Sequence, residues 1–320
     1  MKTIELFNKP LAVTPIIPLS GNYTDNELYM KRDDMIPFSF GGNKARKAAE
    51  FYKEIIKSGA DVVMTYGSNS SNHCRIIANM AAAMGLSCHI ISPEENREIL
   101  YNTKLVEQFG AAIETCPVTM VSETIEKRIE AYKNDGKKPY FITGGGHGNP
   151  GTESYVMAYN EILRQEEKDG IFYDYIFHAS GTGATQAGLV CGKLLAGDED
   201  RTIVGISIAR KEERGRAVVR DSIKEYLGED FDKLYTENAL IFTDSFCCGG
   251  YGNYTSEIEN TIDDVMKREG IPMDTTYVGK AFHGMLRYID EEHIVGKKIL
   301  FIHTGGTPLF FDYIKKISKN

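Results

Sequence analysis

Between residues 61 and 143 the sequence alternates short apolar runs of strand length with longer segments of helical period. A second series of this kind begins at residue 175 and ends near residue 303. Strands that alternate with helices at this spacing form parallel sheets covered by helices. We therefore expect an α/β protein with open, mostly parallel sheets and helices on both faces. The expected strands are 28–32, 61–66, 88–91, 112–115, 139–143, 175–178, 202–207, 240–243 and 298–303. The expected helices are 45–58, 73–84, 98–109, 119–133, 152–168, one running to 195, 212–227, 255–269 and 280–291.

Composition favours small-molecule chemistry. The chain has 320 residues, of which 42% are apolar and 26% charged, as in ordinary globular proteins. This length favours two domains or one large α/β domain. The net charge of −8 provides no clustered positive surface for nucleic acid or an anionic membrane, so neither is an expected partner.

The sequence indicates neither a membrane segment nor a metal site. Residues 1–18 contain no apolar run behind a basic start, and no stretch reaches the roughly 18 apolar residues of a spanning helix. We expect a cytoplasmic protein. The six cysteines are scattered without a CxxC pair, so we expect no metal site and no disulfide framework.

Residues 41–47, with the sequence GGNKARK, contain the candidate reactive group, Lys44. Glycines let a backbone approach a ligand closely. Neighbouring cations lower the pKa of an amine and make it a better nucleophile toward a carbonyl. The alternative is a solvated basic helix face, and we expect Arg46 and Lys47 to be ordinary helix charges of that kind.

A second glycine-rich segment, residues 180–186, lies between an expected strand and an expected helix. Backbone N–H groups at a helix N-terminus bind anions. The segment lacks the lysine of a nucleotide P-loop and does not match GxGxxG, so a single phosphate monoester fits it best. The alternative is a tight turn with a helix cap.

Five further residues follow strands or lie among glycines. Thr304, Ser71 and Asn72 follow strand ends, where ligands of open α/β sheets bind, although Ser71 or Asn72 could simply cap a helix. Tyr251 and Tyr277 lie in glycine-rich settings, although most tyrosines are packing residues. A lysine, a phosphate cradle and a neutral hydroxyl at a strand end together suit pyridoxal phosphate.

The order of seven segments resembles that of D-cysteine desulfhydrases and 1-aminocyclopropane-1-carboxylate deaminases. The resemblance covers essentially the whole chain, and GGNKxRK and YxGKxxxGM are its specific motifs. The segments are KRDD (31–34), GGNKARK (41–47), SSNHCR (70–75), SGTGATQAG (180–188), GYG (250–252), YVGKAFHGM (277–285) and HTGGTP (303–308).

The resemblance implies pyridoxal 5'-phosphate as cofactor and a role for each matching residue. Lys44 would be the Schiff-base lysine, Asn72 would hydrogen-bond the ring hydroxyl, and Ser71 would be the active-site serine. Tyr251 and Tyr277 would flank the substrate and assist proton transfer. The remaining cofactor contacts would be Thr304 at the pyridine nitrogen and the phosphate loop Gly181, Thr182, Gly183, Ala184 and Thr185.

Some positions depart from the family pattern. The phosphate loop often has glycine where Ala184 stands, and its N–H is kept if φ stays negative. The cyclopropane deaminases look to have Glu at the position of Val278. The valine in this sequence makes opening of a cyclopropane ring a less favoured interpretation. The loops 67–70 and 144–151 also differ from the forms usual in the desulfhydrases.

The family fold, fold type II of pyridoxal phosphate enzymes, implies a small domain of residues 49–161. A large domain would combine residues 1–48 and 162–320. A hydroxyl at the ring nitrogen favours elimination, so the expected reaction is α,β-elimination on a small amino acid, giving a 2-oxo acid and ammonia. The alternatives are a cysteine-synthase-like β-replacement enzyme, a cyclopropane deaminase, or a ligand-binding protein without turnover. The resemblance also implies a homodimer.

Overall fold

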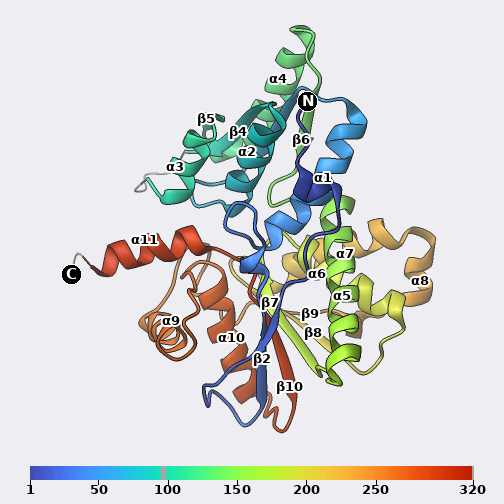
Figure 1. The fold of residues 1–320 in the computed structure, drawn as a ribbon, viewed down its shortest axis with the longest axis vertical. Helices are drawn as coiled ribbons and strands as arrows, with labels where there is room; N and C mark the ends of the chain where they lie inside the picture. Colours follow the sequence, from blue (N-terminus) through green and yellow to red (C-terminus); the bar gives the residue numbers. More distant parts are fainter. Residues whose placement is uncertain (95–98, 319–320) are drawn as a thin grey trace.

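The computed structural model describes residues 1–94 and 99–318, which form two sheets with helices on both faces (Figure 1). This is the α/β architecture expected from the alternating pattern. Figure 1 shows the smaller sheet above the larger one, with α1 and α2 descending toward the region between them. In that arrangement the loops that follow strands of both sheets face a common space.

The smaller sheet comes from the first strand and helix series. Its strands are parallel in the order β5-β4-β3-β6. Side chains of α1, α2 and α3 cover one face around Val63 and Ile90. On the other face, His89 Nδ1 and the Tyr132 hydroxyl of α4 are 2.9 Å apart. The elements are β3 (Val62–Tyr66), β4 (Ser87–Pro93), β5 (Ala112–Cys116), β6 (Pro139–Ile142), α1 (Asn43–Ser58), α2 (Asn72–Met84), α3 (Tyr101–Gln108) and α4 (Val121–Asn134).

The larger sheet contains both ends of the chain, in the order β1-β2-β10-β7-β8-β9. β1 is antiparallel to β2 and the other pairs are parallel. Ile262 and Phe282 pack on one face, and Tyr159 and Val190 pack on the other. The strands are β1 (Ile16–Pro18), β2 (Glu27–Lys31), β7 (Tyr175–Ser180), β8 (Thr202–Ser207), β9 (Ile241–Thr243) and β10 (Lys298–Ile302). The helices are α5 (Asn149–Asp169), α6 (Ala184–Ala196), α7 (Glu212–Leu227), α8 (Phe231–Leu234), α9 (Ser256–Glu269), α10 (Val278–Glu291) and α11 (Thr307–Ile317).

Most predicted elements are present with small differences at their ends. β8 and α7 match the predicted bounds residue for residue. The predicted helix start at residue 98 lies outside the described residues, and α3 begins at Tyr101. The prediction omitted β1, a three-residue strand ending in Pro18, and α11. The sequence of residues 303–308 has the composition of a turn. Its last residue, Pro308, nevertheless lies in the first turn of α11, where proline is tolerated.

Candidate active site

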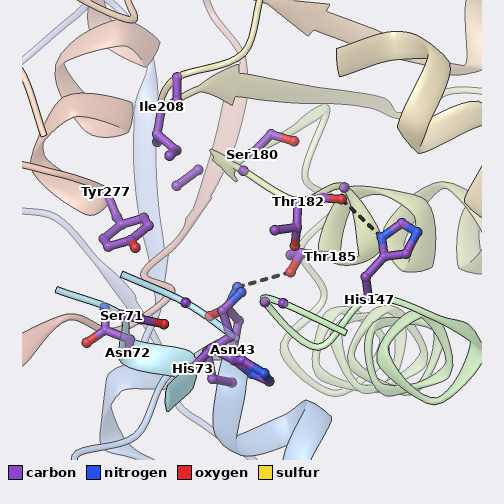
Figure 2. A pocket seen from close by; sticks show the side chains of 18 of the residues that line it. Asn43, Ser71, Asn72, His73, His147, Ser180, Thr182, Thr185, Ile208 and Tyr277 are labelled. Carbon is purple, nitrogen blue, oxygen red and sulfur yellow. Dashed lines mark hydrogen bonds between the residues drawn. The ribbon is translucent and has the colours of Figure 1, made fainter. Parts of the chain in front are cut away.

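A cavity of about 580 Å³ lies where loops of both sheets meet, and it collects the predicted site residues (Figure 2). Among the described residues, none of the side chains that line it is acidic. Ala184 is buried in the first turn of α6 and is not part of the lining. The predicted residues that do line the cavity are Lys44, Ser71, Asn72, Gly181, Thr182, Gly183, Thr185, Tyr251, Tyr277 and Thr304.

Lys44 is the second residue of α1 and is only partly buried because it lines the cavity. The loop before it needs its glycines. Gly42 has φ +96°, and a Cβ there would lie 2.5 Å from the Thr304 carbonyl oxygen. Burial lowers the pKa of Lys44 to about 8, although the contact with Lys47 acts in the opposite direction. The lowered pKa was expected, but burial causes it rather than neighbouring cations.

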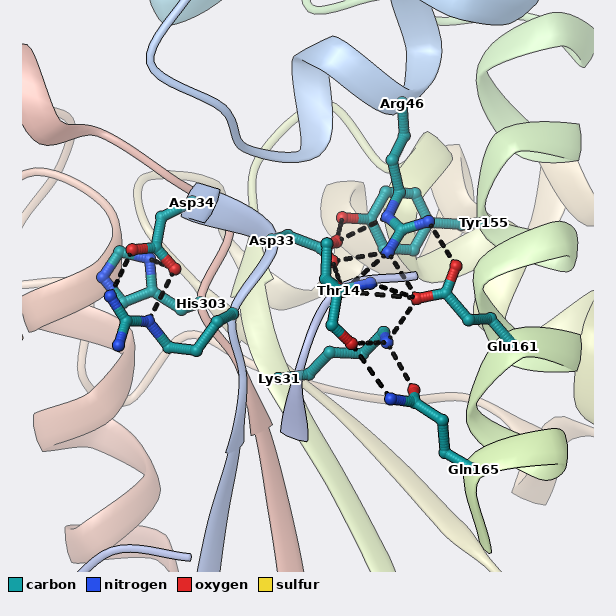
Figure 3. Close-up of polar contacts among 10 residues, drawn as sticks. Thr14, Lys31, Asp33, Asp34, Arg46, Tyr155, Glu161, Gln165 and His303 are labelled. Atoms are coloured by element: carbon teal, nitrogen blue, oxygen red, sulfur yellow. Dashed lines mark hydrogen bonds and ion pairs between the residues drawn. The ribbon is translucent and has the colours of Figure 1, made fainter. Parts of the chain in front are cut away.

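The prediction that Arg46 is an ordinary solvated helix charge was wrong. Arg46 is 5% exposed and belongs to a buried ionic cluster (Figure 3). Its Nη2 donates to Asp33 Oδ1 at 2.7 Å and to Glu161 Oε1 at 3.1 Å. Lys31 Nζ donates to the same Glu161 oxygen at 2.6 Å. The cluster fixes α1 against β2 and α5.

The prediction for Lys47 was also wrong, since this side chain is 1% exposed. Its Nζ donates to the Gly145 carbonyl oxygen at 3.2 Å. Burial, followed by the charge of Lys44, lowers the pKa of Lys47 well below its ordinary value. Gly145 in turn contacts Thr182, so Lys47 lies behind the loop that begins α6.

The segment before α6 forms a cradle of backbone N–H groups and hydroxyls. Gly183 precedes the helix with φ +103°. Asn43 Nδ2 donates to Thr185 Oγ1 at 3.0 Å. Thr182 Oγ1 is buried and has no hydrogen-bond partner among the described residues. Ala184 is helical and has a negative φ, which keeps its N–H in the cradle. The cradle therefore offers donors for an anion.

Ser71 and Asn72 begin α2 at the opposite side of the cavity. Ser71 caps the helix, because its Oγ accepts from the Cys74 N–H at 3.1 Å, and it lines the cavity as well. Asn72 Oδ1 accepts from Arg75 Nη1 at 2.6 Å and from Asn102 Nδ2 at 3.0 Å. With its oxygen occupied in this way, the Asn72 amide can offer its NH₂ group to a ligand.

Tyr251 and Tyr277 come from separate loops, and their hydroxyl oxygens are 2.5 Å apart. Ser70 Oγ and Ser68 Oγ lie 2.8 Å and 3.2 Å from the Tyr251 hydroxyl. Burial raises the pKa of both tyrosines, and that of Tyr277 is also raised by Tyr251. The contacts with Ser68 and Ser70 oppose the rise in the pKa of Tyr251.

Thr304 is the second residue after β10 and is 8% exposed. Its carbonyl oxygen accepts from the Asn43 N–H at 3.0 Å, which connects the end of β10 to the start of α1. The residue thus lines the cavity next to the glycine loop of Lys44.

Some residues of the site were not singled out from the sequence. His147 Nδ1 lies 3.1 Å from the Thr182 carbonyl oxygen and donates to it (Figure 2). Burial lowers the pKa of His147. Asn43 lay inside the GGNKARK segment, and Ser68 and Ser70 lay beside Ser71, so proximity to named motifs was the available signal. For Lys47, no signal in the sequence distinguishes it from a surface charge.

The described residues show neither a spanning helix nor a metal cluster. No helix among them is long and apolar enough to cross a membrane. Likewise, no group of three or more His, Cys, Asp or Glu side chains in residues 1–94 and 99–318 could hold a metal ion.

Comparison with known proteins gives full-length matches. A family profile described as pyridoxal-phosphate dependent enzyme matches residues 8–305. A putative 1-aminocyclopropane-1-carboxylate deaminase from Pyrococcus abyssi is 32% identical over 310 residues, which cover 94% of this chain and 91% of the relative. A D-cysteine desulfhydrase from Serratia proteamaculans is 31% identical over 325 residues, with 94% of each chain covered.

Solved structures also match this chain over most of its length. The crystal structure of an ACC deaminase homologue matches with a TM-score of 0.85 and 34% identity, covering 96% of this chain and 93% of that one. O-Acetyl serine sulfhydrylase isoform 3 from Entamoeba histolytica has a TM-score of 0.67 and 18% identity, covering 95% and 89%. The second likeness shows the fold alone.

Proposed function

Since this chain belongs to the pyridoxal-phosphate dependent enzyme family, we propose that it catalyses α,β-elimination on a small amino acid and releases a 2-oxo acid and ammonia. The observation that carries the proposal is the placement of a desolvated lysine, an anion cradle and a hydrogen-bonded tyrosine pair around one cavity. The relatives include proteins named D-cysteine desulfhydrase, which supports a thiol-bearing substrate.

The residues present fit pyridoxal phosphate. The buried Thr182 Oγ1 lacks a partner among the described residues, and it lies in a cradle that suits a phosphate. Asn72 has a free NH₂ group for the ring hydroxyl, and Thr304 offers a neutral hydroxyl for the ring nitrogen. We propose that these residues hold the cofactor together with the N–H groups of Gly183, Ala184 and Thr185, and with Gly181 in the turn.

Lys44 Nζ would hold the cofactor covalently, and once the substrate's amino group has displaced it, the freed Nζ would accept the substrate's α-proton. Its pKa of about 8 gives a neutral amine at modestly alkaline pH. When bound, the cofactor supplies the electron sink for breaking the Cα–H bond. A hydroxyl at Thr304, rather than a carboxylate, would leave the ring nitrogen of a bound cofactor less protonated, and this would favour loss of a β-substituent over transamination.

The other side chains of the site bind the substrate or transfer protons. Ser71 offers its hydroxyl to the substrate's carboxylate at the N-terminus of α2, where a negative charge is favoured. Tyr251 and Tyr277 share one short hydrogen bond, so a proton given up by either can be replaced by the other. We propose that this pair delivers a proton to the departing β-substituent.

Two other reactions and a non-enzymatic role are weaker candidates. β-Replacement is the reaction of a sulfhydrylase, but the likeness to such an enzyme extends only to the fold. Opening of a cyclopropane ring is supported by the names of relatives, whereas Val278 stands where those enzymes look to have Glu. A ligand-binding protein without turnover would not need the Tyr251–Tyr277 pair.

The domain division and the homodimer also belong to this proposal. We propose a small domain of residues 49–161 and a large domain of residues 1–48 and 162–320, with the cofactor between them. Both boundaries fall inside helices, the first in α1 and the second in α5.

Attachment of the cofactor tests the role of Lys44. The purified protein is incubated with pyridoxal phosphate, reduced with borohydride and digested, and its peptides are weighed by mass spectrometry. We expect the cofactor mass on Lys44, and its absence in Lys44→Ala. Lys53→Ala, a change at an exposed position of the same helix, is the control and should label normally. Labelling elsewhere, or none in the unaltered protein, would refute the cofactor site.

Product analysis tests the reaction. D-Cysteine, L-cysteine and 1-aminocyclopropane-1-carboxylate are each supplied, and 2-oxo acid, ammonia and sulfide are measured. Elimination predicts 2-oxo acid, ammonia and sulfide in equal amounts from one cysteine enantiomer, without an added nucleophile. Product that appears only when a thiol or amine is added would favour β-replacement. A spectral change with no turnover of any amino acid would favour a binding protein.

A further inference from the structure

Lys280 is a fully buried lysine, 0% exposed, in the first turn of α10. Its Nζ donates to three backbone carbonyl oxygens. These belong to Ile208 at 3.0 Å, Cys247 at 3.1 Å and Gly250 at 2.9 Å. One side chain therefore connects the end of β8, the loop after β9 and the start of α10.

The three acceptors require the charged form of Lys280. An ammonium group has three N–H donors and no acceptor, whereas a neutral amine has only two donors. Within residues 1–94 and 99–318, Lys280 takes part in no ion pair with a carboxylate. The groups in direct contact with its charge are three backbone carbonyl oxygens, while Asp274 acts on it from a greater distance. Rings of backbone carbonyls hold a dehydrated monovalent cation in the same way.

The loop that Lys280 contacts has backbone hydrogen bonds of its own but an uncommon backbone conformation. Cys248, Gly249, Gly250 and Gly252 have φ values of +54°, +78°, +144° and +75°. The value at Cys248 is costly for a residue with a side chain. Glycines on both sides of Tyr251 leave its backbone many alternatives in solution. Lys280 adds to the loop's own hydrogen bonds two contacts from outside the loop, which favour the observed conformation.

Lys280 also lies one helical turn from the second tyrosine, since Tyr277 is the residue that precedes α10. A single ammonium thus connects Gly250, the neighbour of Tyr251, to the helix that presents Tyr277. The two hydroxyl groups that are 2.5 Å apart therefore belong to segments that this ammonium joins.

We infer that Lys280 is a positioning residue whose ammonium acts as a built-in monovalent cation and fixes Tyr251 against Tyr277. This inference rests on the proposed function for the catalytic use of the pair, but the cation site itself does not. Removal of the side chain leaves three converging carbonyl oxygens. Gly249, which lies between the Cys247 and Gly250 acceptors in the chain, is exposed, so this loop lies at the surface.

The test is cation rescue. Lys280→Ala is compared with Lys280→Met, whose stem fills the same space without a charge. Each variant is assayed in ammonium, potassium, sodium or tetramethylammonium chloride at equal ionic strength. For Lys280→Ala in tetramethylammonium we expect kcat to fall about 10- to 100-fold, the scale of a roughly 1 Å misplacement, with a smaller change in KM. Ammonium or potassium should restore most of this loss, whereas Lys280→Met and the unaltered protein should respond to the four salts alike.

A second readout does not depend on turnover. Hydrogen exchange followed by mass spectrometry should show faster exchange in residues 244–254 of Lys280→Ala, reversed by ammonium or potassium, with β7 and α6 unchanged. If kcat and exchange stay at the level of the unaltered protein, or if all four salts act alike on Lys280→Ala, the inference is wrong. If the protein turns over no amino acid but exchange shows rescue, the cation site stands and the proposed function fails.

Discussion

Lys44 needs a neutral amine to attack the cofactor's aldehyde, and its burial makes that form accessible. Because burial lowers the pKa of Lys44 to about 8, about half of the amine is neutral at that pH; the neutral fraction falls about tenfold per unit at lower pH and levels off above about pH 9. We expect the rate at which apoprotein binds pyridoxal phosphate covalently to follow this curve. The measurement is the visible absorbance of the bound cofactor after rapid mixing at a series of pH values. A rate that keeps rising through pH 10, toward the ordinary lysine pKa of 10.5, would contradict it.

The sequence shows the reactive lysine more readily than its neighbours, and the reason lies in distance along the chain. The glycines that bring Lys44 into the cavity are adjacent to it, so a local motif contains the signal. Arg46 instead pairs with Asp33 and Glu161, which are 13 and 115 residues away. Nothing local distinguishes such an arginine from a surface charge. The roles of Ser71, Tyr251 and Tyr277 stay predictions, although the cavity brings these residues together.

Helix α1 is anchored as an element by the Asp33–Arg46 pair. Asp33→Asn removes one charge from a buried cluster and leaves Arg46 and Lys31 to share Glu161. Breaking a buried pair in this way costs about 3–5 kcal/mol of unfolding free energy. Urea unfolding should show this loss. The control is Glu123→Gln, which breaks the exposed Lys127–Glu123 pair on α4 and should cost less than about 1 kcal/mol.

The Asp33–Arg46 pair also predicts how the stability of the protein changes at low pH. Burial alone raises the pKa of Asp33, but Arg46 and Lys31 outweigh it and lower the pKa to about 2. A carboxyl group whose pKa is lowered by folding stabilises the protein at pH values above its pKa in the unfolded chain, which is 3.8 for Asp33. This stabilisation is lost as the pH falls toward 2. The unaltered protein should lose this increment over that window, and Asp33→Asn should not. Equal losses in both proteins would show that the pair does not determine acid stability.

Elements were easiest to predict where each residue contributes to a repeating pattern. β8 and α7 have clear periods and sharp ends, and Gly228 stops the helix. β1 has too few residues to show a period and is recognisable only by its pairing with β2. The alternating pattern also could not predict the order of strands in the larger sheet, because β2 pairs with β10 from the far end of the chain. The family resemblance implied a large domain made from both ends of the chain, and that division stays a prediction; the observed pairing places β2 and β10 in one sheet.

At the scale of the whole molecule, the cavity lies between two sheets that two continuous helices connect. α1 contributes Ala45 and Ala48 to the apolar core of the smaller sheet, while its Arg46 pairs with Glu161 of α5. α5 in turn packs Tyr155 and Tyr159 into the core of the larger sheet. Separating the proposed domains would therefore break buried ion pairs as well as helical hydrogen bonds.

This connection predicts that the two proposed domains unfold together. We expect a single calorimetric transition for the apoprotein, with equal calorimetric and van't Hoff enthalpies. Added pyridoxal phosphate at 1,000 times its dissociation constant should stabilise that transition by about 4 kcal/mol, because it binds only the folded state. Asp33→Asn should weaken the coupling, since Asp33 and Glu161 hold the same Arg46 where α1 meets α5. Two resolved transitions in the unaltered apoprotein would show that α1 and α5 connect the domains without coupling their stability.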